Sequence, residues 1–316
     1  METTLETTKA ETKTRARFSL ARILRIIAIA IVILLPISYL GISAVVADKL
    51  SHPTRKTLTS NPGAQDMKYE SVEFNSVPDD VPLKGWYVDS PGEKVIVMMH
   101  GRNSIRDDTN VGLLDIAKEL YGNNYDVLMF DFRAHGESGG DRYSLGWWET
   151  RDVTGALNYL KGRGVTEVGT LAYSMGAATE LLAAPDHPEM RAIVADSAFS
   201  DLTLLLDKEL PKASGLPGFF NPGILFMENL LYGIDIGSTK PEVQMAKLND
   251  RHIFLIHSEI DDLIPISHVY ALQKAGASNP NLSLWIAPGS GHVKGFKNNS
   301  QDYMKKVVDF FNANLR

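Results

Sequence analysis

The stretch EVGTLAYSMGAATELLAA, residues 167–184, joins a short apolar run to a helical pattern, with a serine at the junction. The change from continuous to helical apolar spacing predicts a buried strand followed by a helix. Ser174 stands at the turn between them, two residues after Ala172 and two before Gly176. A serine in such a strained strand-to-helix turn needs small neighbours at both positions. The stretch therefore predicts a nucleophile at the end of a buried strand.

Further strands and helices extend on both sides of this turn. Residues 67–75 alternate as a strand, and 83–89 are expected to pair with them across a turn at 78–80. Short continuous apolar runs, typical of buried parallel strands, cover 94–99, 126–131, 167–172, 191–195, 252–257 and 282–287. Helical patterns cover 110–121, 145–161, 175–184, 266–275 and 300–314. This alternation indicates an α/β fold with a mostly parallel sheet and crossover helices.

The stretch 200–250 interrupts the alternation between two sheet strands. It holds apolar helical pieces separated by Pro211, Pro217, Pro222 and Pro241. We expect a small helical cap over the strand ends. Six apolar residues in or next to this stretch are expected to line an acyl pocket or to form the core of the cap: Phe199, Leu202, Phe219, Phe220, Phe226 and Met227.

Two residues that follow the serine suit the rest of a catalytic relay. A serine hydroxyl is a poor nucleophile until a base takes its proton, and the base needs an orienting carboxylate. Asp261 lies four residues past the strand in HIFLIHSEIDDLIP, and His292 lies in GSGH after the last strand. A glycine-rich loop before a final helix suits a mobile base. Asp262 is the rival acid, and Asp196 is a more remote one.

The motif HGRNS, residues 100–104, follows the first of the buried strands. A tetrahedral oxyanion needs preorganised N–H donors. A turn after His100 would bring the amide of Arg102 to face the amide of Met175, so we expect these two amides to form an oxyanion hole. We expect His100 itself to be a structural turn residue.

Together, HGRNS, DFRAHGES (131–138), AYSMG, the IDDLIP loop and GSGH resemble the α/β-hydrolase superfamily. They are most similar to its bacterial serine aminopeptidase S33-like, or Bem46-like, members. The resemblance covers about residues 67–316 and implies an eight-stranded, mostly parallel sheet with a Ser–His–Asp triad. It implies that the DFRAHGES loop has a structural role near the elbow.

The resemblance also assigns roles by position. It implies the nucleophile Ser174, the acid Asp261, the base His292, and the amide donors Arg102 and Met175. The chain departs from the family pattern where Ala172 and Ala134 each stand for a glycine, and neither departure removes a catalytic group.

These features predict a serine hydrolase that cleaves the carboxylic ester of a small-molecule substrate through an acyl-enzyme, with water as the second acceptor. A peptidase or amidase with the same triad is the nearest alternative. Hydrolases of this fold with an aspartate nucleophile are disfavoured by Ser174. A non-catalytic, membrane-tethered binding protein is the alternative from another class, but such proteins usually lose a triad member.

A separate feature is the uncharged apolar run 26–47, IIAIAIVILLPISYLGISAVVA. About 20 apolar residues span a bilayer core, and Pro36 is tolerated in a membrane helix. Six Lys and Arg residues against three Glu precede the run, which predicts a cytoplasmic tail at 1–25 and a hydrolase domain on the extracytoplasmic side of the cell membrane. The alternatives are a buried core helix and a signal peptide cut before Asp48. The polar residues 48–66 predict a linker.

Composition disfavours several other classes. The chain has 316 residues, 44% of them hydrophobic and 22% charged, with a net charge of -6, so no nucleic-acid partner is expected. It contains no cysteine, which excludes disulfides, thiol nucleophiles and cysteine-ligated metals. The eight histidines form no H-x-x-x-H pair, so we expect no metal and no other cofactor.

Overall fold

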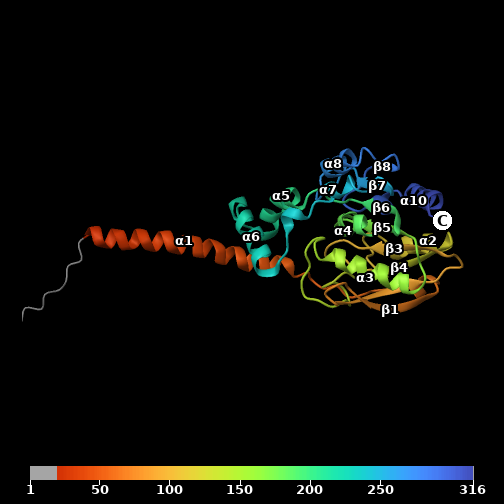
Figure 1. Ribbon diagram of the computed structural model, residues 1–316, viewed down its shortest axis with the longest axis horizontal. Coiled ribbons are helices and arrows are strands. Elements are labelled where there is room, and N and C mark those ends of the chain that lie inside the picture. Colours follow the sequence, from red (N-terminus) through yellow and green to blue (C-terminus); the bar gives the residue numbers. More distant parts are fainter. Residues whose placement is uncertain (1–19, 316) are drawn as a thin grey trace, which may run out of the picture.

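The computed structural model describes residues 20–315, which form a long N-terminal helix followed by an α/β domain (Figure 1). Within these residues, the domain is built on an eight-stranded sheet in the order β1-β2-β4-β3-β5-β6-β7-β8. The strands are β1(Tyr69–Asn75), β2(Pro82–Val88), β3(Lys94–Met99), β4(Tyr125–Phe130), β5(Val168–Tyr173), β6(Met190–Asp196), β7(His252–Ser258) and β8(Leu282–Ala287). The pairs β1–β2 and β2–β4 are antiparallel, and the other pairs of this sheet are parallel. The predicted mostly parallel, eight-stranded sheet is confirmed.

Helices cover both faces of the sheet. Their bounds are α2(Leu113–Gly122), α3(Glu149–Gly162), α4(Met175–Ala183), α8(Ser267–Ala275) and α10(Ser300–Asn314), with the short segments η1(Pro62–Gln65), η2(Ala184–Asp186) and α9(Gly295–Asn298). Alternate side chains of β3 enter opposite layers. Val95 and Val97 share a core with α3, α4 and α8, whereas Ile96 and Met98 share one with α2 and α10. Coverage on both faces explains why the parallel strands are almost continuously apolar.

The residues between β6 and β7 form the cap. It contains α5(Leu202–Ser214), η3(Gly218–Phe220), α6(Asn221–Tyr232), η4(Ile236–Ser238) and α7(Pro241–Met245). The side chain of Asp201 caps the start of α5 by accepting the amides of Thr203 and Leu204. Gly215 and Gly233 end α5 and α6 with φ of 71° and 66°, a left-handed conformation that glycine adopts without strain. Pro217, Pro222 and Pro241 stand at the starts of η3, α6 and α7, as expected of residues that separate helices. The prediction is wrong for Pro211, which lies inside α5.

The N-terminal helix α1(Leu20–Ser51) reaches far beyond the domain (Figure 1). Its most apolar window has a mean hydropathy of 2.6 and is not buried inside the protein, so the buried-core-helix alternative is wrong. By length and composition, α1 is the one helix among residues 20–315 that could cross a membrane. Farther along, one face of α1 becomes buried against the cap through Ser43 and Ala47. Residues 1–19 of the predicted cytoplasmic tail lie outside the described residues.

The predicted linker 48–66 differs from a free tether in the structure. Its first four residues complete α1, and Asp48 forms an ion pair with Arg142 of the domain. The guanidinium of Arg55 donates hydrogen bonds to backbone carbonyls of residues 135, 136, 138 and 140. The polar side chains that suggested a solvated linker therefore hold this segment against the domain.

Candidate active site

Ser174 occupies the sharp turn between β5 and α4. Its backbone has φ 54° and ψ −117°, a conformation that a residue with a side chain adopts only under strain. Its amide donates to the carbonyl of Asp196 at 2.8 Å. A Cβ at Gly176 would lie 2.6 Å from the carbonyl oxygen of His100, and Ala172 is fully buried. Close packing on both sides explains why the turn needs small residues two positions away.

The structure brings together the three side chains predicted for the relay. Nε2 of His292 lies 2.9 Å from Oγ of Ser174, and Nδ1 of His292 lies 2.7 Å from Oδ2 of Asp261. The other oxygen of Asp261 accepts the amides of Leu263 and Ile264 at 3.1 and 2.8 Å. This arrangement can deprotonate the serine hydroxyl and stabilise the imidazolium that results.

The two rival carboxylates lie elsewhere. Asp262 is exposed to solvent. Asp196 is buried, and its carboxylate accepts the hydroxyls of Tyr303 and Ser197, each at 2.9 Å. Burial raises the pKa of Asp196 to about 6.

A cavity of about 600 Å³ opens in front of Ser174 and His292. Arg102 and Met175, the residues predicted to supply the oxyanion amides, line this cavity. A Cβ at Gly101 would lie 3.1 Å from Cβ of Ser174, so the loop 100–104 passes close to the serine. The hole itself stays a prediction.

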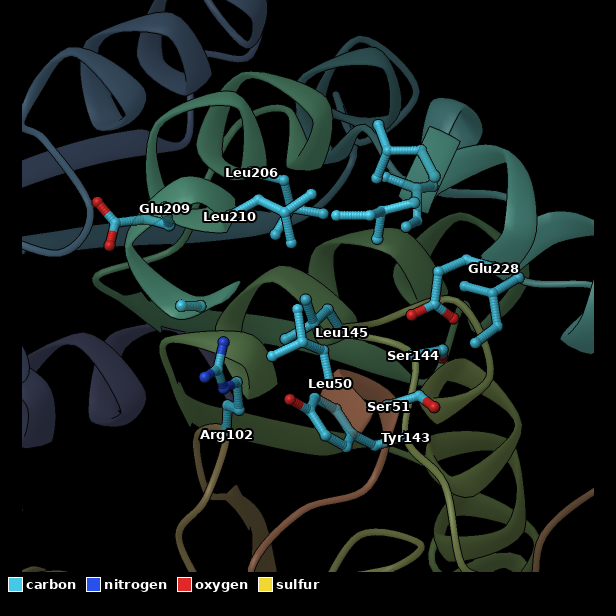
Figure 2. A pocket seen from close by; sticks show the side chains of 15 residues that line it. Leu50, Ser51, Arg102, Tyr143, Ser144, Leu145, Leu206, Glu209, Leu210 and Glu228 are labelled. Carbon is cyan, nitrogen blue, oxygen red and sulfur yellow. The ribbon is translucent and has the colours of Figure 1, made fainter. Parts of the chain in front are cut away.

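A smaller, mainly apolar chamber of about 50 Å³ lies under the cap (Figure 2) and shares Leu145 and Leu206 with the cavity. Among the side chains predicted for an acyl pocket, Phe199 lines the main cavity. Leu202, Phe220 and Met227 pack in the core of the cap, and Phe219 and Phe226 are exposed. Most of that predicted set therefore builds the cap and does not line the pocket.

Comparison with known proteins identifies the family. The model of the family "Serine aminopeptidase, S33" matches residues 90–256. The chain belongs to the S33 family. The matched residues include Ser174 and end before Asp261 and His292.

The chain is also similar to individual bacterial proteins and to a protein of known structure. The uncharacterized protein YqkD of Bacillus subtilis is 29% identical over 72% of this chain and 74% of its own length. The uncharacterized protein YfhR of Escherichia coli K12 is 26% identical over 78% of this chain and 82% of its own length. The fold is similar to that of an esterase of Pyrococcus furiosus, with a TM-score of 0.71 and 24% identity over 84% of this chain and 98% of that one. The chain thus has the α/β-hydrolase fold.

In this S33 protein, two buried histidines, His100 and His135, stabilise the turn that follows β3. Nε2 of His100 accepts the amide of Phe132 at 3.0 Å, and Nε2 of His135 accepts the amide of Asn103 at 3.2 Å. Burial lowers the pKa of both imidazoles to about 4. The neutral rings therefore act as hydrogen-bond acceptors between the loops 100–104 and 131–138.

An ion-pair cluster fastens the same two loops. The Arg106 guanidinium pairs with Asp131 and Glu137, and the Arg106 amide donates to Asp131 at 2.8 Å. Gly136 has φ 46°, and a Cβ there would lie 2.1 Å from Asp131, so only glycine fits. Ala134 also has a positive φ, 61°, at the position where the family pattern has glycine.

Sequence reasoning missed His257, which lies fully buried at the end of β7. Its Nε2 donates to the carbonyl of Ile264 at 2.9 Å and lies 3.8 Å from Oδ2 of Asp261. Burial lowers its pKa, which favours the neutral ring. The imidazole therefore supports the turn that carries Asp261. In the sequence, the one signal for this role was that a histidine ends the mostly apolar run 252–257.

Within residues 20–315, no group of three or more acidic or histidine side chains is arranged to hold a metal ion. The polar residues that line the cavity include Ser174, His292 and the loop around Arg102, together with the charged residues Asp108, Glu209, Lys212 and Lys294.

Proposed function

We propose that the protein is a serine esterase that hydrolyses carboxylic esters through an acyl-enzyme on Ser174. The observation that carries this proposal is the continuous relay from Ser174 through His292 to Asp261 at the mouth of a cavity. The esterase of Pyrococcus furiosus with a similar fold supports the choice of esters.

In this mechanism, His292 takes the proton from Oγ of Ser174 while Oγ attacks the carbonyl carbon of the ester. Asp261 stabilises the imidazolium, and the amides of Arg102 and Met175 stabilise the oxyanion. The tetrahedral intermediate collapses, and His292 gives its proton to the departing alcohol. Water then attacks the acyl-enzyme, with His292 as base, which releases the carboxylic acid and restores the serine hydroxyl.

We further propose that α1 is a retained membrane anchor, with the membrane segment at 26–47 and the hydrolase domain on the extracytoplasmic side. Ser43 and Ala47 are buried against the cap. Loss of α1 by cleavage before Asp48 would uncover that part of the cap, which favours an anchor over a cleaved signal.

A fluorophosphonate probe tests the esterase proposal on the full chain in detergent. We expect the probe to label Ser174 and to block hydrolysis of p-nitrophenyl butyrate. Ser174→Ala should abolish both, with a loss in rate of about 10⁴-fold or more and an unchanged melting temperature. Persistent turnover in pure Ser174→Ala protein would rule out the mechanism, and turnover of an anilide but not of the ester would favour the amidase. Absence of both labelling and turnover would favour a binding protein of the same fold.

A further inference from the structure

The anchor helix and the cap are packed together over the second half of the apolar run. The Tyr39 hydroxyl donates to the carbonyl of Phe219 and accepts the amide of Gly223, both at 2.9 Å. Its ring stacks on Phe220 with centroids 5.1 Å apart. A Cβ at Gly223 would lie 2.5 Å from Oγ of Ser43, so α1 and α6 approach closely. Contacts through small residues of this kind are typical of helices in membranes.

The depth of this contact in a bilayer follows from the length of the apolar run. As a helix, residues 26–47 rise about 33 Å, against a hydrocarbon core of about 30 Å. Tyr39 and Ser43 stand in the second half of that run. If α1 crosses the bilayer, α6 therefore reaches the level of the outer leaflet.

The exposed surface of the cap fits this depth. Beside α1, the cap exposes four large apolar side chains, which we call the cap patch: Phe219, Phe226, Leu230 and Leu231. Val45 of α1, which is 68% exposed, extends the apolar surface onto the anchor. The one acidic residue of α6, Glu228, is buried and lines the apolar chamber (Figure 2).

The same part of the cap borders an apolar chamber that shares lining residues with the cavity of Ser174. The apolar chamber lies among Leu50 of α1, Leu210 of α5 and Ile224 of α6. Leu145 and Leu206 line both this chamber and the cavity that holds Ser174, so the two spaces adjoin. Burial raises the pKa of Glu228 to about 8, which keeps its carboxyl mostly neutral at pH 7. The cavity of about 600 Å³, with the apolar walls that it shares with the chamber, has room for the acyl part of a substrate.

We propose that the cap patch lies in the outer leaflet beside α1, and that the substrate is a membrane lipid whose long acyl chain, in ester linkage, reaches Ser174 from the bilayer. The inference rests on the proposed esterase function for its chemistry. Its occupant is the lipid bilayer, because the patch lies on η3 and α6, which pack against a helix long enough to span one.

Membrane contact can be measured without any activity. The chain has no cysteine, so Leu230→Cys gives a single site for an environment-sensitive fluorophore. Gln301→Cys on α10 is the matched exposed control far from α1 (Figure 1). In phosphatidylcholine vesicles with brominated acyl chains, we expect quenching at position 230 and none at position 301. Equal signals at the two positions would overturn the placement of the cap.

The substrate class is tested with a long-chain monoacylglycerol in phosphatidylcholine vesicles and with soluble p-nitrophenyl butyrate. Leu230→Asp should lower lipid hydrolysis about tenfold, since removal of ~1.4 kcal/mol of membrane contact gives that factor. Butyrate hydrolysis should stay within about twofold, as expected for a surface change away from the site. Val243→Asp, at an apolar residue of α7 that is similarly exposed, should change neither rate.

The outcomes separate this inference from the proposed function. Butyrate turnover that depends on Ser174, without hydrolysis of the lipid ester, would overturn the lipid substrate and leave the esterase standing. An equal loss of both activities in Leu230→Asp, or a loss of neither, would also overturn it. Absence of any turnover that depends on Ser174 would refute the esterase, while the quenching experiment would still decide the position of the cap.

Discussion

Oδ2 of Asp261 lies 2.7 Å from Nδ1 of His292, while Oδ1 of the same carboxylate accepts two backbone amides of its own turn. The two oxygens therefore have separate tasks: one orients the imidazole and the other fixes the loop. The next residue, Asp262, is exposed. The local turn thus decides which of two adjacent acids can serve His292.

Replacement of these two acids should have unequal effects. Asp261→Asn should lower kcat/KM for p-nitrophenyl butyrate by about 10³–10⁴-fold, because the amide no longer stabilises the imidazolium or selects its tautomer. Asp262→Asn is the matched control and should leave the rate within about twofold. Steady-state kinetics of the two variants in the same detergent measures the contrast. Inactivity of Asp262→Asn with normal Asp261→Asn would show that the acid has been assigned one residue too early.

Gly176, two residues after the nucleophile, should also be essential for the geometry of the turn. In Gly176→Ala, the new Cβ would lie 2.6 Å from the carbonyl oxygen of His100, a backbone atom that cannot move away alone. We expect a loss of about 1–3 kcal/mol in unfolding free energy together with reduced activity, since the loop after β3 must shift. Gly122→Ala is the control, because a Cβ there meets nothing within 4 Å. Equal melting temperatures for the two variants would contradict this account of the turn.

Low pH should destabilise the protein through the buried histidines of the loops 100–104 and 131–138. His100 and His135 have a folded-state pKa of about 4, below the ordinary value of about 6.5. Between these values the unfolded chain binds protons that the folded chain excludes, so stability is full above about pH 6.5 and is lost as the pH falls toward 4. Each pKa unit corresponds to about 1.4 kcal/mol. The melting temperature should therefore fall across this range.

A single substitution tests whether the buried histidines cause the loss of stability at low pH. His135→Gln removes one of the two titrating groups, so the melting temperature of the variant should depend less steeply on pH between 6.5 and 4. Both proteins are compared in the same detergent and salt. An identical slope for variant and wild type would mean that other groups cause the loss.

The position relative to the membrane can be tested on intact cells. We expect added protease to digest the domain without lysis, because the basic residues before the apolar run 26–47 favour a cytoplasmic N-terminus. Protection of the domain until lysis would place it in the cytoplasm. N-terminal sequencing of the purified protein completes the test: a mature protein that begins at Asp48 would identify a cleaved signal and contradict the anchor.

Much of the fold was predictable because its signals are local. The apolar runs located the strands, since a parallel strand covered on both faces has few polar positions wherever it lies in the chain. The elbow was predictable for a similar reason: Ser174 and its small neighbours lie within five consecutive residues. Asp261 and His292 were predicted from their positions after later strands, because parallel strands bring their carboxyl ends to one edge of the sheet.

Contacts between distant parts of the chain were decided by the tertiary structure. Arg55 binds the loop 135–140 across about eighty residues, so polar composition alone suggested a free linker. His257 supports Asp261 through the carbonyl of Ile264, a role that no spacing rule indicates. The packing of α1 on α6 depends on Gly223 and Ser43 meeting at close range. A sequence determines such contacts only through the whole fold, because each partner is selected by shape and hydrogen bonding in three dimensions and not by periodicity.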